Sequence, residues 1–142
     1  MSTRTGPVGI GVIGCGMISN TYLENLTRFP DTEVLILGDL NVELARSRAE
    51  EHGVPRWGSS EDVFGNPDVE LVVNLTVPAA HADIAARAIA AGKHVWSEKP
   101  ISIDRESGRD LLAQAAREGL LVGVAPDTVL GPGVQSARRA IS

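Results

Sequence analysis

Short apolar runs alternate with amphipathic segments along this chain. The runs at Val8–Ile13, Val34–Leu37 and Leu71–Leu75 are almost entirely apolar, which is typical of strands buried on both faces of a parallel sheet. After the first run, Tyr22 and Leu26 stand at helical spacing. The alternation therefore predicts strands joined by helical crossovers.

Later segments repeat the pattern. Strands are also expected at His94–Ser97 and Leu120–Val124, with a short extended piece at Pro55–Trp57. Six strands alternating with helices indicate an α/β fold with a doubly wound parallel sheet, in one domain over residues 1–142. The predicted helices lie between Ser19 and Pro30, from Val42 to a close at Gly53, over 60–64, 79–91 and 104–118, and from about 133 onward. The last pattern stops without a cap, so we expect a helix that is cut short.

Composition narrows the range of partners. The 142 residues carry a formal charge of -5, with 43% hydrophobic and 22% charged positions and a mean hydropathy of +0.03. This balance is ordinary for a globular protein and disfavours nucleic acid and anionic membranes. Cys15 is the single cysteine, and no apolar run is long enough for a signal core or a membrane span. We therefore expect a cytoplasmic protein.

A glycine-rich turn follows the first predicted strand. The sequence Gly14–Ser19 matches G-x-G-x-x-G, with serine in the third glycine position, and it lies between a strand and a helix. Gly14 would allow a tight turn, and Gly16 would let the backbone approach a pyrophosphate. The free N–H groups of Met17 and Ile18 would face that anion. This predicts a dinucleotide site of the Rossmann type, and a glycine turn that binds nothing is the alternative.

The end of the second predicted strand offers a carboxylate. Asp39 lies 23 positions beyond Gly16, and its carboxylate would accept hydrogen bonds from ribose hydroxyls and repel a 2′-phosphate, which favours NAD over NADP. Gly38 would leave room for the ribose, and Leu40 belongs to the same expected site. The alternative is that Asp39 only caps the helix that follows. Cys15, with no histidine near it in sequence, is expected to fill space rather than to act as a nucleophile.

Another candidate segment follows the strand at Leu71–Leu75. Thr76, Val77 and Pro78 come first, and His81 lies in the first turn of the next helix, at the expected cofactor end of the sheet. A cofactor or helix-start role for His81 competes with an ordinary exposed histidine. The three histidines have no clustered cysteine or carboxylate partners, so no metal site is predicted.

A charged turn, Glu98-Lys99-Pro100, follows the strand at His94–Ser97. A lysine at the carboxyl end of a parallel strand can hydrogen-bond a substrate oxygen, stabilise alkoxide character during hydride transfer and move a proton. Pro100 restricts the backbone of Lys99 to an extended conformation. The alternative is a surface lysine paired with Glu98.

The chain resembles the Gfo/Idh/MocA oxidoreductases, relatives of glucose–fructose oxidoreductase and inositol dehydrogenase, over nearly its whole length. The resemblance rests on Gly14-Cys15-Gly16, Asp39, Pro78-x-x-His81, the run from Ala91 to Val95, and Glu98-Lys99-Pro100. It implies that Lys99 corresponds to the catalytic lysine of the family, that Glu98 lies by the nicotinamide ribose, and that the loop 76–81 borders the nicotinamide half of the cofactor.

Two departures from the family qualify this resemblance. Family members continue into a second α/β domain that supplies substrate contacts, an acid–base histidine and the oligomer interface, and these 142 residues contain no such domain. The segment 123–128 also lacks the aromatic-arginine sequence that many members carry, which favours an atypical substrate.

We therefore expect the NAD-binding domain of a dehydrogenase that acts on a secondary alcohol or ketone of a sugar, cyclitol or related polyol. NADP is the less favoured cofactor. The full-length protein is expected to form a homo-oligomer, and the present chain to bind cofactor without efficient turnover. Two rival hypotheses are a non-catalytic NAD-sensing module and a methyltransferase that binds S-adenosylmethionine through the same glycine turn.

Overall fold

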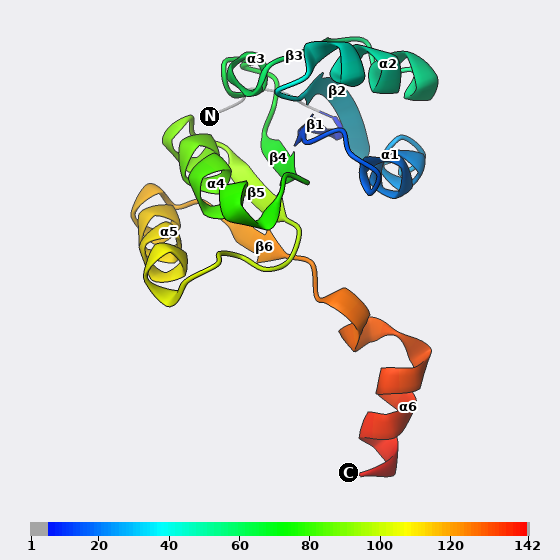
Figure 1. Cartoon of the computed structure of the whole chain (residues 1–142), viewed down its shortest axis with the longest axis vertical. Helices are drawn as coiled ribbons and strands as arrows, with labels where there is room; N and C mark the ends of the chain where they lie inside the picture. The colour runs from blue at the N-terminus through cyan, green and yellow to red at the C-terminus, as the bar shows by residue number, and fades with distance from the viewer. Residues whose placement is uncertain (1–5, 142) are drawn as a thin grey trace.

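Six parallel strands form one sheet in the order β3-β2-β1-β4-β5-β6 (Figure 1). The structure, a computed structural model, describes residues 6–141, without the side chains of residues 127 and 128. The strands are β1 Val8–Ile13, β2 Thr32–Gly38, β3 Trp57–Gly58, β4 Leu71–Asn74, β5 His94–Ser97 and β6 Val122–Val124. This confirms the predicted doubly wound sheet. The strand order reverses between β1 and β4, so the carboxyl ends of these two strands are where a ligand site is expected.

Helices cover both faces of the sheet. They are α1 Ser19–Leu26, α2 Val42–His52, α3 Ser60–Phe64, α4 His81–Ala90, α5 Arg105–Glu118 and α6 Pro132–Ala140, with single 3-10 turns at η1 Pro78–Ala80 and η2 Asp127–Leu130. One apolar cluster packs α1 and α2 on one face, and a second packs α3, α4 and α5 on the other. Helix α6 projects away from the sheet (Figure 1), and none of its residues is buried.

Local signals set several helix ends. Helices α2 and α5 end at Gly53 and Gly119 in the left-handed conformation, as glycine permits. A reciprocal capping box between Ser59 and Asp62, which form a Ser-x-x-Asp pattern in the sequence, starts α3. Helix α1 stops at Leu26, before the expected end at Pro30, and the Thr32 hydroxyl donates to the free carbonyl of Leu26 at 2.7 Å.

A buried lysine locks the connection that leads into β4. Lys93 is 4% exposed, and its ammonium donates to the carbonyl oxygens of Asn66 at 2.7 Å and Val69 at 2.8 Å. Burial lowers the pKa of Lys93, and the charge of Asp68 opposes that effect. This lysine, which belongs to a motif that carries the family resemblance, therefore has a structural task. Within residues 6–141, no helix combines the length and apolarity needed to cross a membrane.

Candidate cofactor site

The glycine turn after β1 is fixed by the neighbouring strand. Gly14 has a φ of 100°, and a Cβ at this position would lie 2.6 Å from the carbonyl carbon of Leu75. Its N–H donates to the carbonyl oxygen of Gly38 at 2.8 Å. Both the backbone conformation and the close approach therefore require glycine at position 14.

No packing contact from the described part of the chain requires a glycine at position 16. A Cβ at this position would meet no atom within 4 Å, so packing does not explain the residue. The N–H groups of Gly16, Met17 and Ile18 have no acceptor among residues 6–141, and they precede the first turn of α1. Unpaired amides at the start of a helix, beside a position without a side chain, fit a pyrophosphate.

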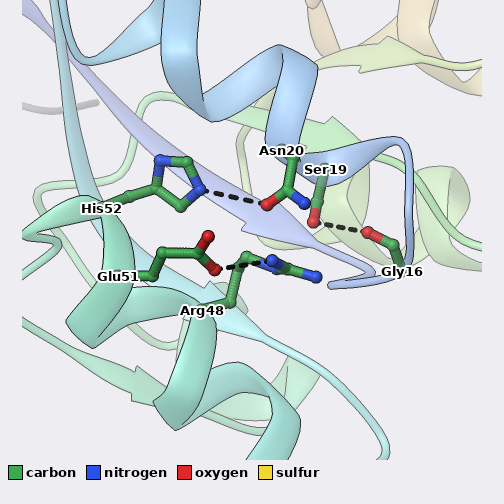
Figure 2. Close-up of polar contacts among 6 residues, drawn as sticks. All are labelled: Gly16, Ser19, Asn20, Arg48, Glu51 and His52. Atoms are coloured by element: carbon green, nitrogen blue, oxygen red, sulfur yellow. Dashed lines mark hydrogen bonds and ion pairs between the residues drawn. The ribbon is translucent and has the colours of Figure 1, made fainter.

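Ser19 replaces the third glycine of the motif at a fully buried position. Its hydroxyl donates to the carbonyl oxygen of Gly16 at 2.6 Å, which closes the turn from within (Figure 2). Behind the turn, Asn20 Oδ1 lies 3.1 Å from His52 Nε2, so the last turn of α2 contacts the first turn of α1 (Figure 2). A small residue is accommodated here, and it adds a hydrogen bond that glycine could not make.

Asp39 is tied to the glycine turn. Its Oδ2 accepts the N–H of Cys15 at 2.7 Å, and its Oδ1 accepts the N–H of Asn41 at 2.9 Å. The cap of α2 is Asn41, whose side chain accepts the N–H of Leu44, so the cap interpretation of Asp39 is wrong. The carboxylate instead stands between the ends of β1 and β2.

Cys15 and Gly38 both lie close to Asp39, and the structure agrees with the prediction for Cys15 but not with the one for Gly38. Cys15 is fully buried, and its pKa is raised to about 12 by burial first and by the Asp39 carboxylate second, which suits a space-filling thiol. The expectation that Gly38 makes room for a ribose is wrong. A Cβ on Gly38 would lie 2.7 Å from Val63 Cγ2 and 2.9 Å from the Ser59 carbonyl oxygen, so protein atoms fill that space.

The loop after β4 is organised by Asn74, which is fully buried. Its Oδ1 accepts the Thr76 hydroxyl at 2.7 Å and the Thr76 N–H at 3.3 Å. Its Nδ2 donates to the carbonyl oxygen of His81 at 3.0 Å. One amide therefore holds both ends of the loop 76–81, and this polar residue explains the single break in the apolar run of β4.

His81 bridges two loops. The ring is 1% exposed, so the alternative of an ordinary exposed histidine is wrong. Nδ1 lies 2.6 Å from the carbonyl oxygen of Pro100, and Nε2 lies 2.8 Å from that of Thr76. Both ring nitrogens are therefore engaged by main-chain carbonyls, and the ring joins the loop after β4 to the loop after β5.

The turn after β5 presents Glu98 and Lys99. Glu98 Oε1 accepts the hydroxyl of Tyr22 at 2.7 Å, and Oε2 accepts the N–H of Lys99 at 3.2 Å. Among residues 6–141, no ion pair joins the Lys99 ammonium to a carboxylate, so the paired-lysine alternative is not observed. Lys99 is exposed, and the peptide bond to Pro100 is cis. Tyr22 was expected only as an apolar helix position, because periodicity carries no information on its hydroxyl.

These side chains line one pocket of about 670 Å³ at the carboxyl edge of the sheet, together with Thr76, Pro78 and Ile18. A second hollow of about 810 Å³ lies over the sheet face beside α1, and its lining is almost entirely apolar. An apolar lining does not suit phosphates, so the first pocket is the candidate site. We call Gly14–Ser19 with Asp39 the glycine half, and residues 74–81 with 98–100 the lysine half.

A parallel sheet in this order, with free amides at the β1 turn and a carboxylate at the end of β2, defines a dinucleotide-binding domain. The sequence profile described as "Oxidoreductase family, NAD-binding Rossmann fold" matches residues 8–125. The chain belongs to this family, the Gfo/Idh/MocA oxidoreductases, and it is an NAD(P)-binding oxidoreductase domain of that family.

Two curated relatives of this chain are named as oxidoreductases. The chain is 36% identical over 119 residues to inositol 2-dehydrogenase 3 of Saccharopolyspora erythraea, covering 82% of this chain and 35% of the relative. It is 31% identical over 114 residues to 1,5-anhydro-D-fructose reductase of Ensifer adhaerens, covering 80% of this chain and 34% of the relative. The chain thus spans about a third of the length of these two relatives.

Two solved structures illustrate the fold likeness. GenD2 from gentamicin A biosynthesis, in complex with NAD, matches all of this chain and 41% of its own at 25% identity and a TM-score of 0.90. KijD10, a 3-ketoreductase from Actinomadura kijaniata in complex with TDP-benzene and NADP, matches 95% of this chain and 43% of its own at 29% identity and a TM-score of 0.88. Because one neighbour holds NAD and the other NADP, the likeness does not distinguish the two cofactors.

Proposed function

We propose that this chain is the NAD(H)-binding domain of a dehydrogenase that acts on a secondary alcohol or ketone of a sugar, cyclitol or related polyol. The observation that carries the proposal is the shared pocket, in which Glu98 and Lys99 stand beside the loop 76–81 at the edge that also bears the glycine turn. Bound nicotinamide would supply the hydride acceptor or donor. The named activities of the two relatives above support the substrate class.

The glycine half is proposed to hold the adenosine and pyrophosphate portions. The N–H groups of residues 16–18 would donate to the pyrophosphate, with Cys15 packed beneath them. Asp39, oriented by the Cys15 and Asn41 amides, would accept ribose hydroxyls and disfavour a 2′-phosphate, with Leu40 beside it. NAD is therefore the proposed cofactor.

The cofactor preference is testable by calorimetry. Asp39→Ala should lower the ratio of NAD to NADP affinity by about 10-fold or more, because the repulsion toward a 2′-phosphate is removed. Glu43→Gln is the matched control, since it removes an exposed carboxylate from the first turn of α2. An unchanged ratio in Asp39→Ala would show that the ribose assignment is wrong. Tighter binding of S-adenosylmethionine than of NAD by the parent chain would instead favour a methyltransferase.

The lysine half is proposed to hold the nicotinamide portion. Thr76, Val77, Pro78 and Glu98 would border the nicotinamide and its ribose, with His81 and Pro100 holding the two loops together. Lys99 would hydrogen-bond the substrate oxygen, stabilise its developing negative charge and share in its proton transfer. Substrate contacts and the homo-oligomer interface are proposed to lie outside this chain, in a cytoplasmic protein.

Turnover tests the role of Lys99, and it is assayed on the protein that carries the substrate contacts, with a panel of sugars and cyclitols. Lys99→Ala should reduce kcat by about 100-fold or more while NAD affinity changes little. Arg105→Ala is the control, because Arg105 is another exposed cation beyond the same turn. A kcat within a few-fold of the parent would remove Lys99 from the mechanism. A parent that binds NAD but turns over no substrate would favour the NAD-sensing module.

A further inference from the structure

Tyr22 of α1 stands at the wall between two hollows. Its ring lines both the pocket that contains Glu98 and Lys99 and the apolar hollow on the sheet face. Its hydroxyl donates to Glu98 Oε1 at 2.7 Å, across 76 positions of sequence. The indole N–H of Trp96 donates to the same hydroxyl oxygen at 3.4 Å. The phenol is therefore the middle member of a directed series of hydrogen bonds that ends on a carboxylate.

Each carboxylate oxygen of Glu98 accepts one hydrogen bond in this network. Oε1 accepts the phenol, and Oε2 accepts the backbone N–H of Lys99 at 3.2 Å. Rotation of the carboxylate would break one of these two contacts. The phenol contact at 2.7 Å has the usual length of an O–H···O hydrogen bond, whereas the amide contact at 3.2 Å is long for an N–H···O bond, so the phenol is the stronger constraint.

Helix α1 connects this hydrogen bond to the glycine half of the site. It begins at Ser19, directly after the glycine turn, and Tyr22 lies one turn later on the side that faces β5. The same short helix thus starts at the free amides of the glycine half and reaches the carboxylate of the lysine half. The hydrogen bond between Tyr22 and Glu98 therefore links the two halves.

We propose that Tyr22 is a positioning residue, whose hydroxyl fixes the Glu98 carboxylate and, through Glu98, the backbone of Lys99 at the lysine end of the pocket. The assignment of this end of the pocket as the nicotinamide site rests on the proposed function. The hydrogen bonds themselves are a property of the chain without any cofactor. The two parts can therefore be tested separately.

The first test uses the phenol as its own reporter. Tyr22 is the single tyrosine of the chain, so phenolate absorbance during a pH titration reports it alone. Burial raises the pKa of Tyr22, the Trp96 hydrogen bond opposes the rise, and Glu98 adds to it. Glu98→Gln should lower the titration midpoint and Trp96→Phe should raise it. Trp57→Phe is the matched control, because Trp57 lies on β3 at the far edge of the sheet.

The second test measures ligand binding by calorimetry with NADH and with ADP. Tyr22→Phe keeps the ring and removes only the hydroxyl, so circular dichroism should be unchanged. NADH affinity should fall about 5- to 10-fold, the value of one lost hydrogen bond, whereas ADP affinity should not change because ADP needs only the glycine half.

The outcomes separate the two proposals. Midpoints that do not move in Glu98→Gln and Trp96→Phe would overturn the hydrogen-bond series and with it the positioning role. Midpoints that move as expected, with NADH affinity unchanged in Tyr22→Phe, would overturn the positioning role alone. A parent chain that binds neither NADH nor ADP contradicts the proposed function instead, and the phenolate titration then decides whether Tyr22 fixes Glu98.

Discussion

The glycine half and the lysine half of the site are built from different parts of the chain. In the glycine half, main-chain amides and one carboxylate form the surface, and a neighbouring strand dictates the conformation of Gly14. In the lysine half, side chains make the connecting hydrogen bonds: the His81 ring contacts the main-chain carbonyl of Pro100, and the Tyr22 hydroxyl donates to the Glu98 carboxylate. The first half should therefore respond to changes of backbone shape, and the second to the loss of particular polar atoms.

The largest change in the free energy of unfolding is expected at Gly14. Gly14→Ala places a Cβ 2.6 Å from the Leu75 carbonyl carbon at a φ of 100°, so overlap and backbone strain both act. We expect the free energy of unfolding to fall by about 4 kcal/mol, the sum of a strained conformation and an overpacked contact. Urea denaturation followed by circular dichroism measures the change.

Gly16→Ala is the matched control within the same turn. Its Cβ enters open space, so the free energy of unfolding should change by less than about 1 kcal/mol. NAD affinity should nevertheless fall, because the methyl group would occupy the approach of the pyrophosphate. Equal destabilisation by the two substitutions would contradict the idea that contact with the end of β4 fixes Gly14 alone.

A smaller effect is expected at His81, in the lysine half. His81→Gln leaves a side chain that can donate to one carbonyl but cannot span from Thr76 to Pro100, so one buried carbonyl loses its partner. The free energy of unfolding should fall by about 2 kcal/mol. Hydrogen exchange should rise at residues 76–81 and 98–101, and NADH should bind more weakly while ADP does not.

His52→Gln is the control for this substitution. His52 is partly exposed, and its Nε2 lies 3.1 Å from Asn20 Oδ1 behind the glycine turn (Figure 2). Its loss should cost less than about 1 kcal/mol. If His52→Gln destabilised the chain as much as His81→Gln, the hydrogen bonds that join the two loops would contribute no more to stability than the contact of His52.

The difference between local patterns and contacts across the chain explains which features the sequence could predict. The glycine turn, the strands and the capping box of Ser59 and Asp62 depend on neighbours a few positions apart, so local patterns indicated them. The contact of Tyr22 with Glu98 spans 76 positions, and the burial of His81 depends on where the carbonyl of Pro100 lies in space. Gly38 was misjudged for the same reason, because the atoms that fill its space come from Val63 and Ser59.

The smallest change in the free energy of unfolding at neutral pH is expected at Cys15, which carries the thiol of the glycine half. Cys15→Ala removes a buried sulfur and should lower the free energy of unfolding by about 1 kcal/mol at pH 7. The folded pKa of about 12 lies above the ordinary value of 9.0. The unfolded chain therefore releases the thiol proton first as pH rises.

The stability that the thiol contributes is consequently complete below pH 9.0 and is lost as pH rises toward about 12. The gap between parent and Cys15→Ala, measured by urea denaturation at a series of pH values, should narrow above pH 9.0 and then change sign. Lys93, whose lowered pKa acts in the opposite direction, is present in both chains and cancels in the difference. A gap that stays constant through the alkaline range would mean that the thiol is not held protonated by burial beneath the glycine turn.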